Sequence, residues 1–150
     1  MTISHSAFGL LGEQLSHSYS KIIHEHFGYS YNLFEVPSTE LADFMAKREF
    51  AGINVTIPYK QKVLDYCDVV DDIACKIGAA NTLYFDNAGR LHATNTDYFG
   101  FIDALNFCDV DLSNKTVTVF GFGGAARAII FAALAMNVKK IYIISRSCAQ

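Results

Sequence analysis

The sequence has few of the features that mark a protein for nucleic acid, a membrane or export. It contains no basic run and its formal net charge at pH 7 is −3, so bulk charge does not favour binding to nucleic acid or to an anionic membrane. Its most apolar stretch, at 128–136, is too short to span a bilayer. The first residues lack the basic and apolar segments of a signal peptide. We therefore expect a cytoplasmic protein whose partners are small molecules.

The cysteines do not form a metal-binding or disulfide pattern. None of them stands in a CxxC spacing, and no histidine pattern typical of a zinc site lies nearby. We expect no metal ion, and we expect reduced, buried thiols at Cys67, Cys75, Cys108 and Cys148.

Apolar residues, in contrast, are plentiful. Hydrophobic residues make up 51% of the chain and charged residues 18%, which is typical of a protein that folds around a core. A length of 150 residues suggests one domain, or one domain and part of another.

Predicted strands and helices alternate along the chain. The patterns predict strands over residues 7–12, 31–36, 52–57, 81–85, 90–94, 116–120 and 141–145. They predict helices over residues 21–27, 38–49, 58–67, 70–78, 97–107 and 125–137. Ser38 is the expected N-cap of the second helix, and the turn at 86–89 joins two strands into a hairpin. This alternation favours an α/β fold with a mostly parallel sheet.

A polar segment at 108–115 divides the chain into two units, 1–110 and 111–150. The second unit holds only two predicted strands and one helix, too few for a stable open parallel sheet. We therefore expect a whole first domain followed by the beginning of a second. The unfinished unit would expose apolar surface and strand edges, so we expect a possible homodimer, or disorder beyond about residue 110.

The segment GFGGAAR at 121–127 indicates a dinucleotide site. Gly121, Gly123 and Ala126 fit the G-x-G-x-x-[GA] fingerprint, directly after an apolar strand and directly before an apolar helix. Gly121 would permit the tight turn, while Gly123 and Gly124 would let the backbone approach a pyrophosphate at the helix N-terminus. The alternative is an ordinary glycine-rich turn of a βα unit.

The end of the next strand favours NADP over NAD. An NAD-binding site usually has Asp or Glu there to hold the ribose 2′-OH. This chain has Ser145, Arg146 and Ser147, and a guanidinium with neighbouring hydroxyls suits a 2′-phosphate. The alternative is that Arg146 is an ordinary solvated residue.

The segment NVTIPYK at 54–60 presents a lysine just after a predicted strand. Pro58 ends that strand, so Lys60 is either a solvated residue or a side chain aimed at the end of the sheet. Asp97, in NTDYFG, is either a helix N-cap or the partner of this lysine. A lysine oriented by a carboxylate can take a proton from an alcohol, as a dehydrogenase without a metal requires.

Other polar residues suit a small acid with hydroxyl groups. Ser18 and Ser20 precede a predicted helix, where two hydroxyls and a helix N-terminus can hold a carboxylate. Locally, Ser20 is explained equally well as a plain N-cap. Asn81 offers a donor and an acceptor at the start of a strand, and taken singly it is more often structural.

Together, these segments resemble the shikimate dehydrogenase family. The motifs that carry the resemblance span nearly the whole chain in the family's order and stand here as GEQLSHSYS, NVTIPYK, GAANT, NTDYFG and GFGGAAR. The resemblance implies an N-terminal α/β substrate-binding domain followed by the start of a Rossmann NADP-binding domain. It also implies NADP-linked, reversible oxidation of shikimate to 3-dehydroshikimate, a step toward chorismate and the aromatic amino acids.

The same resemblance assigns roles to residues. It implies that Lys60 and Asp97 are the catalytic pair, and that shikimate is bound by Ser18, Ser20, Asn54, Thr56, Lys60, Asn81 and Asp97. It implies a phosphate loop of Gly121, Gly123, Gly124, Ala125 and Arg127, and a clamp for the adenosine phosphate of Ser145, Arg146 and Ser147.

The chain departs from the family pattern at three places. Lys21 replaces a frequent proline, Glu13-Gln14 replaces a frequent Asn-Pro, and Ser145 replaces a frequent asparagine. The first two border the expected carboxylate site and bear on a choice between shikimate and quinate. Two alternatives therefore stay open: a quinate/shikimate dehydrogenase that uses NAD, and a catalytically silent module that binds shikimate. Intact Lys60 and Asp97 argue against the second.

Overall fold

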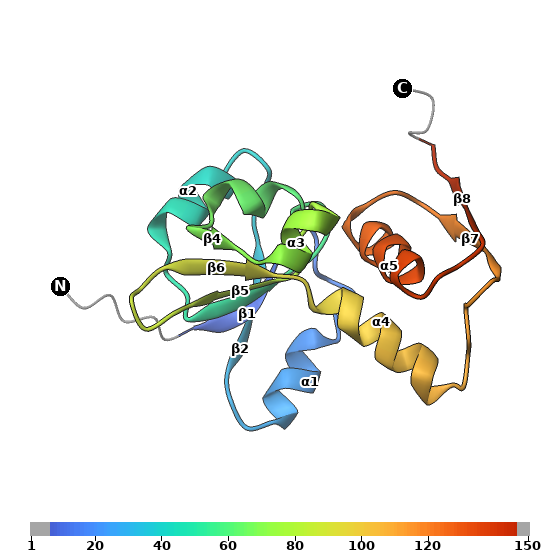
Figure 1. The fold of residues 1–150 in the computed structure, drawn as a ribbon. Helices are drawn as coiled ribbons and strands as arrows, with labels where there is room; N and C mark the ends of the chain where they lie inside the picture. Colours follow the sequence, from blue (N-terminus) through green and yellow to red (C-terminus); the bar gives the residue numbers. More distant parts are fainter. Residues whose placement is uncertain (1–6, 147–150) are drawn as a thin grey trace.

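The computed structural model describes residues 7–146, and a six-stranded sheet dominates it (Figure 1). The sheet has the order β2-β1-β3-β5-β6-β4. Its strands are β1 (Phe8–Gly12), β2 (Tyr31–Glu35), β3 (Gly52–Val55), β4 (Val69–Val70), β5 (Thr82–Phe85) and β6 (Leu91–Thr94). Three of the five pairings are parallel, and the hairpin strands β5 and β6 account for the two antiparallel ones. The α/β fold with a mostly parallel sheet is confirmed.

Five helical segments accompany this sheet. They are α1 (Ser20–His26), α2 (Leu41–Lys47), the 3-10 helix η1 (Lys62–Tyr66), α3 (Asp72–Ile77) and α4 (Thr96–Phe107). A smaller parallel sheet follows, made of β7 (Thr116–Phe120) and β8 (Lys140–Ile144) with α5 (Gly124–Ala135) between them. Within residues 7–146, no helix is long and apolar enough to cross a lipid bilayer.

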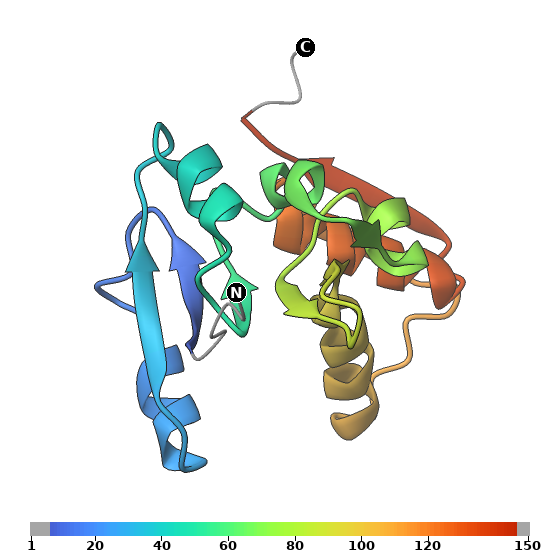
Figure 2. The ribbon, with the colours of Figure 1, turned by 90° about the vertical axis from the view of Figure 1, so that its left-hand side faces the viewer.

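The two faces of the large sheet differ in character, because successive side chains of a strand point to opposite faces. Leu11, Ile53, Val55 and Leu83 lie on one face, in a core that also takes in residues of α2, η1 and α3. The other face carries the row Leu33, Leu10, Asn54 and Thr82, which are cross-strand partners. Helix α1 lies beside this second face, next to the edge strand β2 (Figure 2). The second face is therefore the more polar one.

The second unit packs against the first through helices. Helix α5 contacts α3 and α4, and the rings of Tyr98 and Phe131 lie 5.6 Å apart (Figure 1). The segment 108–115 connects α4 to β7. The division at residue 110 stays a prediction, although the two sheets fall on either side of it.

Several predicted boundaries are wrong for local reasons. Ser38 does not cap α2, because Glu40 N–H donates to Pro37 O in a preceding turn and the helix begins at Leu41. The predicted helix at 58–67 is a turn followed by the short η1. Strand β4 has only two residues and was not predicted, since two residues show no periodicity.

The prediction of buried thiols is wrong at two described positions. Cys75 and Cys108 are exposed, and Cys67 is partly buried. Cys148 lies outside the described residues. Burial raises the pKa of the Cys67 thiol to about 11, so this thiol stays protonated at neutral pH.

Candidate functional site

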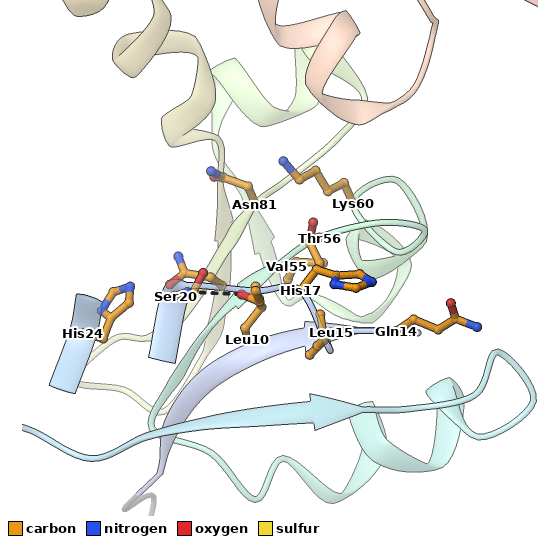
Figure 3. Close-up of a pocket in the computed structure, with 12 residues that line it drawn as sticks. Leu10, Gln14, Leu15, His17, Ser20, His24, Val55, Thr56, Lys60 and Asn81 are labelled. Atoms are coloured by element: carbon orange, nitrogen blue, oxygen red, sulfur yellow. Dashed lines mark hydrogen bonds between the residues drawn. The ribbon is translucent and has the colours of Figure 1, made fainter. Parts of the chain in front are cut away.

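A cavity of about 460 Å³ opens on the polar face of the sheet, where β1 and β3 end (Figure 3). Figure 3 shows Lys60 and Asn81 on the side of α4 and α5, with Ser20 and His24 on the side of α1. Six predicted substrate residues line this cavity: Ser18, Ser20, Asn54, Thr56, Lys60 and Asn81. The structure thus brings together residues that the sequence spreads over more than sixty positions.

The backbone around Lys60 is held from two sides. Tyr59 is 0% exposed, and its hydroxyl donates to Val36 O at 2.5 Å. Burial, with Glu13 nearby, raises the pKa of Tyr59 and keeps this hydroxyl a donor. On the other side, Ala80 N–H donates to Lys60 O at 2.7 Å. The Ile57–Pro58 peptide just before this turn is cis.

Lys60 contacts Asp97, the one predicted substrate residue that is not among those lining the cavity. Lys60 Nζ donates to Asp97 Oδ2 at 2.6 Å, and the Lys60 side chain is only 14% exposed. Asn81 Nδ2 donates to the other carboxylate oxygen, Oδ1, at 2.9 Å. The predicted contact between Lys60 and Asp97 is confirmed, whereas their catalytic role stays a prediction.

The N-cap of α4 is Asn95, which leaves Asp97 available for Lys60. Asn95 has extended backbone angles and is 0% exposed; its Oδ1 accepts from Tyr98 N–H at 3.3 Å. Its Nδ2 donates to Ala79 O at 2.8 Å, so the cap is tied to the turn before β5. The expectation that Asp97 opens the helix is therefore wrong, because the helix begins at Thr96 and the capping position is Asn95.

Ser18 and Ser20 stand where α1 begins. Ser18 Oγ accepts from Ser20 N–H at 3.2 Å, while the capping position itself is Tyr19. The alternative that Ser20 is the N-cap is therefore wrong. Glu35 Oε1 accepts from Leu15 N–H at 2.6 Å and holds the preceding loop against the sheet. Both hydroxyls thus lie on the wall of the cavity.

Six further residues line the cavity, and three of them are polar residues that sequence reasoning did not select as substrate contacts: Gln14, His17 and His24. Gln14 stands at one of the departures from the family pattern, and this departure was the available signal. Lys21, the other departure, is not among the lining residues. Its Nζ donates to Tyr31 O at 3.0 Å and pairs with Glu25 at 3.0 Å.

The glycine loop lies on the other side of Lys60 from the first cavity. Gly121 has a φ of +105°, which L side chains rarely adopt, so the predicted tight turn is confirmed. Gly123 is the N-cap of α5 without a capping side chain, which leaves the first N–H groups of the helix for an anion. A second cavity of about 280 Å³ is lined by Gly123 and Gly124 together with Ile57, Pro58, Lys60 and Gln61. Lys60 therefore lines both cavities, and the glycine loop offers the tight turn and the free N–H groups that a dinucleotide pyrophosphate requires.

The other predicted cofactor residues do not line the second cavity in the described part of the chain. Ala125 is exposed in the first turn of α5. Arg127 lies over the Phe122 ring, 4.6 Å from its centroid, and its buried Nε has no hydrogen-bond partner among the described residues. Ser145 and Arg146 follow β8 directly, and Ser147 lies outside the described residues. Within residues 7–146, no group of three His, Cys, Asp or Glu residues could hold a metal ion.

The chain is similar to a known protein family, to curated proteins and to solved structures. The family model described as "Shikimate dehydrogenase substrate binding domain" matches residues 10–83. The NADP(+) shikimate dehydrogenase of Clostridium beijerinckii is 42% identical over 148 residues, which cover 93% of this chain and 54% of the relative.

Solved structures of shikimate dehydrogenases share the fold. Shikimate dehydrogenase 1 from Peptoclostridium difficile has a TM-score of 0.89 at 31% identity, over 95% of this chain and 57% of the other. Shikimate 5-dehydrogenase from Thermus thermophilus, in complex with NADP(H) and shikimate, has a TM-score of 0.81 at 33% identity. That match covers 94% of this chain and 56% of the other. The chain thus spans about half the length of the relatives it matches.

Proposed function

Because the chain belongs to the shikimate dehydrogenase family, we propose that it provides the substrate site of an enzyme that reversibly oxidises shikimate to 3-dehydroshikimate with NADP. The observation that carries this proposal is the position of Lys60, which lines both cavities and contacts Asp97 at 2.6 Å.

Lys60 and Asp97 handle the proton of the reacting hydroxyl. In the oxidation, Lys60 Nζ takes this proton as the C–H bond of the alcohol carbon breaks and the ketone forms; in the reduction it returns the proton. The bound cofactor supplies the hydride acceptor, so the carbon loses a hydride and the oxygen a proton. Asp97 orients Lys60 through Oδ2, and Asn81 holds Asp97 through Oδ1. These hydrogen bonds keep the base directed at one position.

The remaining substrate contacts divide by chemistry. Ser18 and Ser20 bind the carboxylate of shikimate at the start of α1, where hydroxyl donors line the cavity. Asn54, Thr56 and Asn81 supply amide and hydroxyl partners for the ring hydroxyls.

The glycine loop would hold the phosphates of NADP. Gly121, Gly123 and Gly124 support this assignment through the turn and the open N-terminus of α5. Ala125, Arg127, Ser145, Arg146 and Ser147 complete the proposed cofactor residues. We keep an NAD-using quinate/shikimate dehydrogenase as the second candidate, because Gln14, which stands at a departure from the family pattern, lines the cavity.

The wider setting follows from the same family. We propose a cytoplasmic enzyme of chorismate and aromatic amino acid biosynthesis that acts without nucleic acid or membrane and has the capacity to pair with a second copy. Its substrate is a small acid, in keeping with the size of the cavity and its serines.

Calorimetric titration and steady-state kinetics test the proposal. Titration of the chain with shikimate, and with quinate for comparison, should give binding that is lost in Ser18→Ala/Ser20→Ala. In the complete gene product, Lys60→Ala should lower kcat by about 10²–10⁴-fold, the usual contribution of a general base. Lys60→Ala with near-full turnover and unchanged shikimate affinity would refute the assignment of the base.

A further inference from the structure

A continuous row of hydrogen bonds leads from the far side of the sheet to Asp97. It starts at the Tyr31 hydroxyl, 2.7 Å from Asn54 Oδ1, and Asn54 Nδ2 lies 3.2 Å from Thr82 Oγ1. Thr82 Oγ1 lies 3.2 Å from Asn81 Oδ1, and Asn81 Nδ2 then reaches Asp97. Asn54 and Asn81 line the cavity, whereas Tyr31 and Thr82 do not.

One backbone group determines the direction of every bond in this row. Thr96 N–H can only donate, and it lies 2.8 Å from the Asn81 amide, so the Asn81 atom facing it is Oδ1. Thr82 must then donate its single hydroxyl proton to that oxygen and accept from Asn54. Asn54 accordingly turns Nδ2 toward Thr82 and Oδ1 toward Tyr31.

Tyr31 is built to donate at the other end of the row. Its side chain is 2% exposed, and its ring stacks on His24 with centroids 4.0 Å apart and planes 3° from parallel. Burial, with Tyr29 nearby, raises the pKa of Tyr31 to about 12, so the hydroxyl keeps its proton. Asn54 is therefore held by a donor on one side and an acceptor on the other.

We propose that Tyr31 and Thr82 are positioning residues for substrate binding: they lock the Asn54 amide in one of its two orientations. A locked amide presents its spare lone pair and its spare N–H at set places on the cavity wall. If the lock is removed, the amide can rotate by half a turn and exchange donor and acceptor. This inference rests on the proposed function, because shikimate is the ligand that would hydrogen-bond to the Asn54 amide.

The test uses the complete gene product with the variants Tyr31→Phe, Thr82→Val and both together. Each single variant should weaken shikimate binding roughly threefold to tenfold, the range that one ordinary hydrogen bond represents. KM should change and kcat should change little, because Thr96 still holds Asn81 beside Asp97. The double variant should bind shikimate more weakly than either single variant, because only this variant leaves the Asn54 amide without both of its anchors.

Two controls separate positioning from general damage. Tyr84→Phe removes the hydroxyl of another tyrosine on the same face of the sheet, and that hydroxyl has no hydrogen-bond partner in the described part of the chain. It should bind shikimate as the wild type does. Thr82→Ser keeps the bridging hydroxyl and should restore binding. Equal affinities for Tyr31→Phe and Tyr84→Phe, or a double variant that binds shikimate as tightly as the wild type, would overturn the inference.

A measurement without ligand keeps this inference distinct from the proposed function. In ¹H–¹⁵N spectra of the free protein, the side-chain amide signals of Asn54 should shift in Tyr31→Phe and Thr82→Val and stay in place in Tyr84→Phe. If the wild-type protein does not bind shikimate, the proposed function is refuted. If the Asn54 signals stay in place in both Tyr31→Phe and Thr82→Val, the inference that these residues orient the Asn54 amide is refuted, whether or not shikimate binds.

Discussion

Gly124 shows how a single missing side chain can serve the site. A Cβ at this position would lie 2.7 Å from Cβ of Lys60, closer than real Cβ atoms come, and 3.1 Å from its Cδ, which is a tight contact. A Cβ at Gly123 would meet nothing within 4 Å. Close approach to a phosphate was the reason expected for both glycines, but Gly124 has a second reason: it makes room for Lys60.

Gly124→Ala should displace Lys60 and lower turnover. A shift of about 1 Å in a catalytic group costs on the order of 10²-fold, so we expect kcat to fall roughly tenfold to a hundredfold. Steady-state kinetics of the complete gene product measure this. Gly100→Ala, in α4 with open space around it, should leave kcat unchanged. Full activity of Gly124→Ala would mean that Lys60 moves aside without cost.

At the scale of elements, the start of α4 joins stability to the site. Asn95 caps the helix and also binds Ala79 O, so one buried side chain sets where Thr96 and Asp97 lie.

Asp68, between η1 and β4, also connects distant parts of the chain. Its carboxylate accepts hydrogen bonds from the Arg48 guanidinium at 2.7 and 3.0 Å and from Leu91 N–H at 2.7 Å.

Asn95→Ala should destabilise the fold by about 2–3 kcal/mol, because it removes a helix cap and leaves Ala79 O buried without its donor. Chemical denaturation measures the free energy of unfolding. Asn87→Ala, in the exposed hairpin turn, is the matched control and should change it by less than about 0.5 kcal/mol. Equal stabilities of the two variants would contradict the structural role of Asn95.

Asp68 should contribute a pH-dependent part of the stability. The Arg48 guanidinium and the Leu91 N–H lower its pKa from 3.8 to about 2. The unfolded chain binds this proton more readily than the folded one, so the stabilisation is complete above pH 3.8 and is lost as pH falls toward 2. Asp68→Asn should therefore flatten the decline in unfolding free energy over this range, and Asp103→Asn, on the exposed side of α4, should not. An unchanged slope in Asp68→Asn would show that other groups cause the decline.

At the scale of the whole molecule, the second unit leaves apolar side chains uncovered. Phe120 in β7 is 78% exposed, and Tyr142 and Ile144 in β8 are also exposed. Residues 116–144 nevertheless form β7, α5 and β8, so the alternative of disorder there is not what the structure shows. Exposed apolar groups on a two-stranded sheet favour association.

Light scattering should therefore detect dimers of the 150-residue chain at micromolar concentration. Phe120→Glu should shift the population toward monomer, because it places a charge on the exposed apolar surface. The control is Tyr19→Glu, which makes the same aromatic-to-acidic change at an exposed side chain of the first unit. This variant should associate as the wild type does. A wild-type chain that stays monomeric would remove the prediction of a homodimer.

The sequence by itself determined the α/β alternation, the hairpin and the glycine loop, because local periodicity and turn residues carry these features. It also singled out Lys60 and Asp97 through motifs. Only the tertiary structure decided that Asn95 is the cap, that Gly124 makes room for Lys60, and that Tyr31 and Thr82 hold Asn54. Each of these depends on contacts between strands or helices far apart in the chain. Such contacts follow from sheet order and register, which no local pattern records.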